Sequence, residues 1–258
     1  MAFFETIAVA FAMYSAIPVP QPEWNQRNMR YALCAFPLVG VACGLLWWGW
    51  SVVCGVLGFP DLLRGAGFCL LPVMVTGGIH LDGYADTSDA LSSHAPREKK
   101  LEILKDSHCG AFAAIKLCGY FTASWALCCT LRPSREAIWC VGLAFVLSRA
   151  MSGFAIAAFP LAKNTGLAYT FAVGADRRRA QVVLALTTAA AAAAMCWIGR
   201  AAGAGMVATA VLVYWHYYHT AKKQFGGITG DLAGWFLQRA EVWMLAALVL
   251  CQYAGGLG

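Results

Sequence analysis

The chain has 258 residues, of which 60% are hydrophobic and only 12% are charged, and its formal net charge at pH 7 is +6. This balance excludes an ordinary soluble domain and is typical of a polytopic membrane protein. The basic residues are confined to short loops, so we expect no nucleic-acid partner. The 11 cysteines form no C-x-x-C motif, which favours small buried thiols over a metal site.

Apolar runs predict an all-α transmembrane helical bundle. Residues 2–17 are apolar but end at Pro18, so we expect a short interfacial or half-inserted helix there; no basic segment precedes it, and we expect no cleaved signal. Each spanning helix needs about 20 mostly apolar residues. The predicted spans, about seven, are residues 31–58, 62–78, 110–131, 137–159, 180–199, 203–219 and 240–255. Residues 1–258 are therefore interpreted as a single integral membrane domain surrounded by lipid.

The loops between these spans differ in charge. Loops 18–30, 79–109, 160–179 and 220–239 fall at one end and contain most of the Lys and Arg residues. The loops at the other end contain only Arg64, Arg132, Arg135 and Arg200. The positive-inside rule places the basic end in the cytoplasm, which predicts a multi-pass protein of the cytoplasmic membrane.

The loop after the second span contains a cluster of acids. Asp82, Asp86 and Asp89 have the spacing that places side chains on one face of a helix. At roughly 6 Å and an effective dielectric near 20, each pair repels by about 3 kcal/mol, so these acids need a wet cavity or a cation. Hard oxygen ligands suit Mg²⁺ or Mn²⁺, whereas a solvated helix N-terminus is the alternative interpretation. His80 lies off this face and is a candidate base or a residue that supports the ligands.

Two further segments contain candidate site residues. Residues 97–105 predict an amphipathic surface helix, and Lys105-Asp106-Ser107 follow directly before the third span. We expect Lys105 to hold phosphate oxygens and Asp106 to supply another metal ligand, with Ser107 beside the substrate. Arg149 lies inside the fourth span, where an arginine is a functional candidate that pairs with acids or phosphate.

A glycine-rich turn precedes the last span. Such a turn can present backbone N–H groups to a phosphate, which makes Gly227, Thr229 and Gly230 candidate substrate-binding residues, although glycines also simply break helices. Asp231 is a further candidate ligand for a metal or a hydroxyl group. The predicted active-site segments are therefore residues 77–110 and 225–241, both at the basic end.

With these motifs the chain resembles the cobalamin synthase family, also called the adenosylcobinamide-GDP ribazoletransferase family. The resemblance covers nearly the whole length. The segments that carry it are Ile17-Pro18-Val19-Pro20, Phe36-Pro37-Leu38-Val39-Gly40, Gly77 to Asp89, Arg97 to Gly110, Leu147-Ser148-Arg149 and Gly227 to Asp231. The chain departs from the family pattern at His108, Ala113 and Trp235, and these differences concern details of phosphate binding.

The resemblance implies an Mg²⁺-dependent transferase. The ribose 3′-hydroxyl of α-ribazole, or of its 5′-phosphate, would attack the cobinamide-linked phosphorus of adenosylcobinamide-GDP. GMP would leave, and adenosylcobalamin or its 5′-phosphate would form. Since this reaction needs charge neutralisation and alignment, we expect one or two Mg²⁺ ions on the diphosphate.

The residues take the following expected roles. Asp82, Asp86 and Asp89, with Asp106 or Asp231, would hold Mg²⁺. Lys105 and Arg149 would offset charge on the transferring and leaving oxygens. Whichever of these carboxylates is left unligated, or His80, would take the hydroxyl proton. The sequence does not decide which group is the base. It also leaves the oligomeric state open, and a homo-oligomer is one possibility.

Three alternatives fit part of the pattern. A CDP-alcohol phosphotransferase would continue the Asp82-Gly83 start differently, because Asp86 directly follows Ala85. An intramembrane prenyltransferase would have two aspartate-rich motifs, whereas the second site here offers only Asp231. A cation or proton transporter would mark a route across the membrane with its acids, which here gather at one end.

Overall fold

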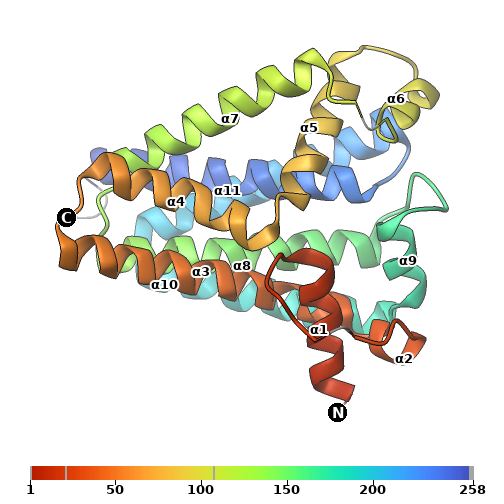
Figure 1. Cartoon of the computed structure of the whole chain (residues 1–258), viewed down its shortest axis with the longest axis horizontal. Coiled ribbons are helices and arrows are strands. Elements are labelled where there is room, and N and C mark those ends of the chain that lie inside the picture. The colour runs from red at the N-terminus through yellow and green to blue at the C-terminus, as the bar shows by residue number, and fades with distance from the viewer. Residues whose placement is uncertain (1, 21, 107, 256–258) are drawn as a thin grey trace.

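The computed structural model describes residues 2–20, 22–106 and 108–255, which form an all-α bundle (Figure 1). Its helices are α1 (Ala2–Tyr14), α2 (Gln26–Met29), α3 (Ala32–Leu57), α4 (Asp61–Thr76), α5 (Ile79–Ser92), α6 (Arg97–Ile103), α7 (Ala111–Thr130), α8 (Arg135–Ala158), α9 (Leu167–Gly174), α10 (Arg177–Thr220), the π-helix η1 (Ala221–Phe225) and α11 (Gly230–Tyr253). Within these ranges the only β-pairing is an isolated bridge between Leu161 and Ile228. The predicted fold class is confirmed.

Five helices in the described part of the chain are long and apolar enough to cross a membrane, namely α3, α7, α8, α10 with η1, and α11. The protein is therefore a multi-pass membrane protein. The short apolar helix α1 lies below the length of a span and packs on α3, in agreement with the expected short N-terminal helix.

Helix α10 contains a reversal of the chain at Arg200. The backbone there has φ 47° and ψ −124°, which is not helical, and a Cβ atom on Gly203 would overlap the carbonyl oxygen of Met195. Met195 and Gly203 would lie about 12 Å apart in a continuous helix. Their contact therefore means that the two arms of α10 fold back on each other. The arms correspond to the predicted spans 180–199 and 203–219, with the break at the predicted loop.

The predicted span 62–78 corresponds to α4, which runs from one end of the bundle toward the other but is short for a span (Figure 1). Helix α4 has 16 residues, fewer than the roughly 20 that a span needs. It ends where Gly77 and Gly78 have φ values of 62° and 81°, and α5 continues at 95° to it, so that only the bent pair α4–α5 together is a sixth candidate span. Positive φ is accessible to glycine, which explains the sharp turn. Figure 1 shows α5 lying across the end of the bundle, and we place α5 outside the spans.

The two ends of the bundle differ as the loop charges predict. One end holds the α3–α4 and α7–α8 turns and the last turn of α11, where the Arg132 N–H donates to Gln252 at 3.1 Å (Figure 1). The opposite end holds α5, α6, α9 and the start of α11. The predicted segments with candidate site residues therefore lie together at the basic end.

Candidate active site

The close packing of α5 on α11 positions the candidate site. A Cβ atom on Gly83 would lie 2.7 Å from the Asp231 carbonyl oxygen, and one on Gly234 would lie 2.9 Å from the His80 carbonyl oxygen. Only glycine allows two backbones to approach so closely at both positions. The contact brings the acids of α5 beside Asp231 in the first turn of α11.

A cavity of about 180 Å³ lies at this contact, between α5, the start of α11 and the loop 159–166. Its polar lining includes His80, Asp82, Lys163, Thr229 and Asp231. The Lys163 Nζ atom lies 3.7 Å from the Asp231 carboxylate, and both side chains are less than one-third exposed. The predicted convergence of α5 with the glycine-rich turn is therefore observed.

Lys163 is a candidate site residue that the sequence does not indicate, because it is one of several basic residues in the predicted loops. Its loop is tied to the glycine-rich turn by two backbone hydrogen bonds, from Ala162 N–H to the Ile228 oxygen at 2.9 Å and from Ile228 N–H to the Pro160 oxygen at 2.8 Å. These bonds join residues that lie 66 and 68 positions apart in sequence. No local pattern around Lys163 indicates them.

The acids form one electrostatic cluster around Asp86. Burial and, to a smaller extent, the neighbouring Asp82, Asp231 and Asp89 carboxylates raise the pKa of the Asp86 carboxyl to about 6, with Lys163 acting in the opposite direction. A carboxyl surrounded by like charges favours its protonated form, or a cation beside it. The predicted repulsion between these acids is thus present in the structure.

Asp89 and Asp106 have other partners. Asp89 Oδ1 accepts from the Ala113 N–H at 3.3 Å, at the N-terminus of α7, where a carboxylate complements the helix dipole. Asp106 is exposed and accepts from the His108 backbone N–H at 3.0 Å, and the two hydrogen bonds with His108 lower the pKa of Asp106. Lys105 is exposed as well, and neither it nor Asp106 lines the cavity. Ser107 lies outside the described residues.

The backbone of the glycine-rich turn is held mainly by contacts with other parts of the protein. The Gly227 N–H donates to the Ala221 oxygen at 3.1 Å, and Gly227 packs against the backbone of residues 160–162. Its N–H is therefore occupied, contrary to the predicted role in substrate binding. Thr229 caps α11 by accepting from the Leu232 N–H at 3.2 Å, and its hydroxyl donates to Asp231 at 3.2 Å. Thr229 and Gly230 both line the cavity, as their predicted role requires.

His80 faces the cavity as a neutral imidazole. Its side chain is buried between Tyr14 and Phe36, and neither ring nitrogen has a hydrogen-bond partner among the described residues. Burial and, to a smaller extent, the Arg149 charge lower its pKa to about 3. A ring with so low a pKa is a poor general base near neutral pH.

Arg149 does pair with an acid, but not with the aspartate cluster. Its Nη1 lies 2.6 Å from Glu241 Oε1, and its side chain is fully buried between α8 and α11. The same nitrogen donates to the Phe145 oxygen at 2.9 Å. Arg149 does not line the acidic cavity, so the structure separates it from the place where a phosphate would lie.

The residues present fit a magnesium ion that arrives with its substrate. Among the described residues, no three His, Cys, Asp or Glu side chains are close enough to hold a metal ion by themselves. Magnesium commonly binds one or two carboxylates together with substrate phosphates, and Asp82 and Asp231 supply such oxygen donors to one cavity.

Comparisons with known proteins identify the family of the chain. A family model of cobalamin-5-phosphate synthase matches residues 6–249. The adenosylcobinamide-GDP ribazoletransferase of Lachnoclostridium phytofermentans is 37% identical over 252 residues, covering 98% of this chain and 96% of the relative. Proteins with the same name from Clostridium perfringens and Geobacillus thermodenitrificans are 30% and 29% identical, over 93% and 92% of this chain and 95% and 94% of the relatives. No solved structure matches significantly.

Proposed function

Because the chain belongs to the cobalamin-5-phosphate synthase family, and is therefore a transferase of cobalamin biosynthesis, we propose that it joins α-ribazole or α-ribazole 5′-phosphate to adenosylcobinamide-GDP. GMP leaves, and adenosylcobalamin or its 5′-phosphate forms. The proposed attack is by the ribose 3′-hydroxyl on the cobinamide-linked phosphorus. The CDP-alcohol, prenyl-transfer and transport alternatives have no comparable support.

The observation that carries the proposal is the shared cavity of α5, α11 and the loop 159–166. Displacement at a diphosphate depends on neutralising charge and aligning the attacking oxygen. Acidic ligands from two helices and a lysine from a third segment meet at this cavity, which suits both requirements. The proposal places the diphosphate between Lys163 and the acids.

Asp82 and Asp231, supported by Asp86 and Asp89, are the residues that would hold Mg²⁺. When bound, the ion would neutralise charge on the diphosphate oxygens. Thr229 holds the Asp231 carboxylate through its hydroxyl, at 3.2 Å. Lys163 takes the charge-offsetting role expected of Lys105 and Arg149, because it is a lysine in the cavity lining.

The proton of the attacking hydroxyl is assigned to a carboxylate. An imidazole with a pKa of about 3 is poorly matched to proton transfer near neutral pH, so an aspartate that lines the cavity is the better base. His80 then serves as a hydrogen-bond partner for the bound substrate, because both of its ring nitrogens are unpaired among the described residues.

The experiment is a transfer assay with purified protein in nanodiscs. Adenosylcobinamide-GDP, α-ribazole or its 5′-phosphate, and Mg²⁺ are supplied, and GMP and the cobalamin product are quantified by mass spectrometry. Asp82→Ala should lower the rate by at least roughly a thousandfold, since losing a direct metal ligand removes several kcal/mol of transition-state stabilisation. Asp61→Ala is the control, because Asp61 pairs with Arg64 at the opposite end of the bundle. Absence of product, or an Asp82→Ala rate within about tenfold of wild type, would contradict the activity or the metal role respectively.

A further inference from the structure

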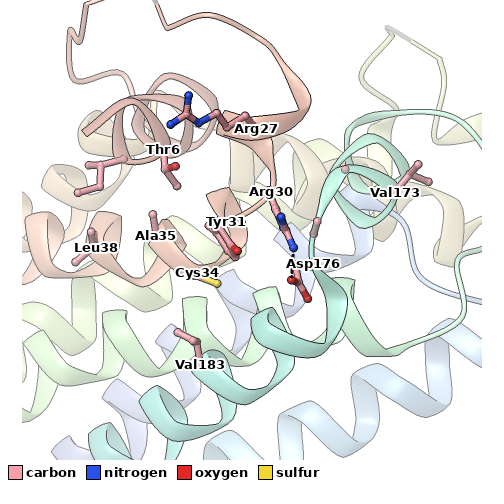
Figure 2. A pocket seen from close by; sticks show the side chains of 13 residues that line it. Thr6, Arg27, Arg30, Tyr31, Cys34, Ala35, Leu38, Val173, Asp176 and Val183 are labelled. Carbon is pink, nitrogen blue, oxygen red and sulfur yellow. Dashed lines mark hydrogen bonds and ion pairs between the residues drawn. The ribbon is translucent and has the colours of Figure 1, made fainter. Parts of the chain in front are cut away.

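A second, larger cavity lies on the side of the bundle, between α1, α2, α3, α9 and the start of α10 (Figure 2). Its volume is about 1180 Å³, and it shares no lining residue with the acidic cavity. Nothing in the proposed transfer reaction uses it. Its lining therefore has no role in that reaction.

The mouth of this cavity is positively charged. Arg27 and Arg30 line it, and Arg30 forms an ion pair with Asp176 at 3.0 Å. The same Asp176 carboxylate is shared with Arg179 at 3.5 Å. Arg27 is exposed and forms no ion pair or hydrogen bond with any residue in the described ranges. Three guanidinium groups against one carboxylate leave an excess of positive charge at the mouth.

The floor of the cavity is apolar and opens toward the side of the bundle. Ala35 and Leu38 from α3 face Val183 from α10 below the arginines in Figure 2. Leu38 and Val183 are 38% and 40% exposed, and both belong to helices that are candidate membrane spans. The floor therefore continues into the apolar helix surface that would face lipid. An apolar slot below a cationic mouth matches one molecule with a charged head and a hydrocarbon tail.

We propose that this cavity is a specific site for an anionic phospholipid. The headgroup phosphate binds Arg27 and Arg30, and an acyl chain lies along Leu38 and Val183. Basic pockets at the cytoplasmic side of membrane helices select anionic headgroups, and the cavity lies at the basic end of this bundle. A soluble anion would satisfy the arginines but leave the apolar floor uncovered. This inference goes beyond the proposed transfer activity and does not depend on it.

The test is native mass spectrometry of delipidated full-length protein titrated with phosphatidylglycerol or phosphatidylcholine. Wild type should bind phosphatidylglycerol more tightly than phosphatidylcholine. Arg27→Gln with Arg30→Gln should weaken phosphatidylglycerol binding by roughly fivefold for each arginine and weaken phosphatidylcholine binding less, because the choline cation offsets the charge of its phosphate. The single variant Arg27→Gln should weaken phosphatidylglycerol binding by half as much on a logarithmic scale. Because it removes no ion pair, it keeps the test valid if the double variant misfolds.

The matched control is Arg177→Gln with Arg178→Gln. These arginines are exposed at the same end, and neither lines the cavity, so the control loses the same charge. An equal loss of phosphatidylglycerol binding in the control would overturn the proposal, because it would indicate general surface attraction. Displacement of phosphatidylglycerol by inorganic phosphate alone would also overturn it, since the site would then hold a free anion.

Discussion

At the residue scale, Lys163 is the most informative side chain that the structure adds. It lines the acidic cavity and lies 3.7 Å from the Asp231 carboxylate. We expect Lys163→Met to lower kcat by roughly 10²- to 10³-fold, because a preorganised charge beside a diphosphate stabilises developing negative charge. The measurement is GMP release at saturating substrates and Mg²⁺.

Lys222→Met is the matched control, because Lys222 on η1 lies 5.9 Å from the centre of the Tyr218 ring of α10, and neither residue lines the acidic cavity. It should retain wild-type kcat. If both variants kept full activity, Lys163 would have no part in the transfer and the diphosphate would lie elsewhere.

Asp86 gives a prediction about pH. Its pKa in the folded chain is about 6, above the ordinary value of 3.8, mainly because of burial. The protonated form is therefore favoured by folding, and stability from this group is present below pH 3.8 and is lost as the pH rises through about 6. Asp86→Asn removes this loss.

We expect Asp86→Asn to unfold about 2 °C higher than wild type at pH 7.5 in EDTA, allowing for solvent screening of a partly exposed carboxyl. The difference should vanish near pH 4. Tryptophan fluorescence during heating measures the unfolding temperature at each pH. The control Asp61→Asn, at the other end of the bundle, should leave the unfolding temperature unchanged. A lower unfolding temperature for Asp86→Asn at pH 7.5 would mean that the carboxylate is held by a favourable contact instead.

At the scale of elements, the site depends on the approach of α5 to α11. A Cβ atom on Gly83 would lie 2.7 Å from the Asp231 oxygen, well inside ordinary contact distance. Gly83→Ala should therefore push α5 away and lower kcat by roughly 10²-fold, the effect of a displacement of about 1 Å at a catalytic site. Helix content, measured by circular dichroism, should stay at the wild-type level.

Gly119→Ala in α7 is the control for this change, because a Cβ atom there meets nothing within 4 Å. It should retain activity. Wild-type activity of Gly83→Ala would show that the distance between the two helices does not set the positions of the reacting groups.

The elements could largely be predicted from sequence, and their partners could not. The aspartate spacing predicts a helix at α5 because a 3.6-residue period groups those side chains, but this period does not identify the neighbouring helix. Asp89 therefore turns out to cap α7, and Arg149 pairs with Glu241, which lies 92 positions away. Likewise, the glycines of the turn before α11 predict a tight backbone, whereas only the packing on residues 160–162 shows that Gly227 serves the fold.

At the scale of the whole molecule, composition and apolar run lengths predict an all-α membrane bundle because a bilayer fixes the length of each span. The same argument predicts the break near Arg200. The predicted span 62–78 ends at the turn of Gly77 and Gly78, but run length does not give the 95° angle at which α5 follows, which two consecutive glycines with positive φ produce. The separation of loop charges between two ends also follows from sequence, since each span carries the chain from one end to the other.

The orientation in the membrane is the last prediction. Helix α11 begins beside the acidic cavity and ends at the opposite, charge-poor end of the bundle (Figure 1). If the basic end faces the cytoplasm, the end of α11 lies outside. Alkaline phosphatase fused after residue 255 of the full chain should therefore be active, and green fluorescent protein at the same position should not fluoresce. The opposite pair of results would place the acidic cavity on the outer face, away from the cytoplasmic supply of a nucleotide-linked substrate, so it would contradict both the orientation and the proposed access of adenosylcobinamide-GDP.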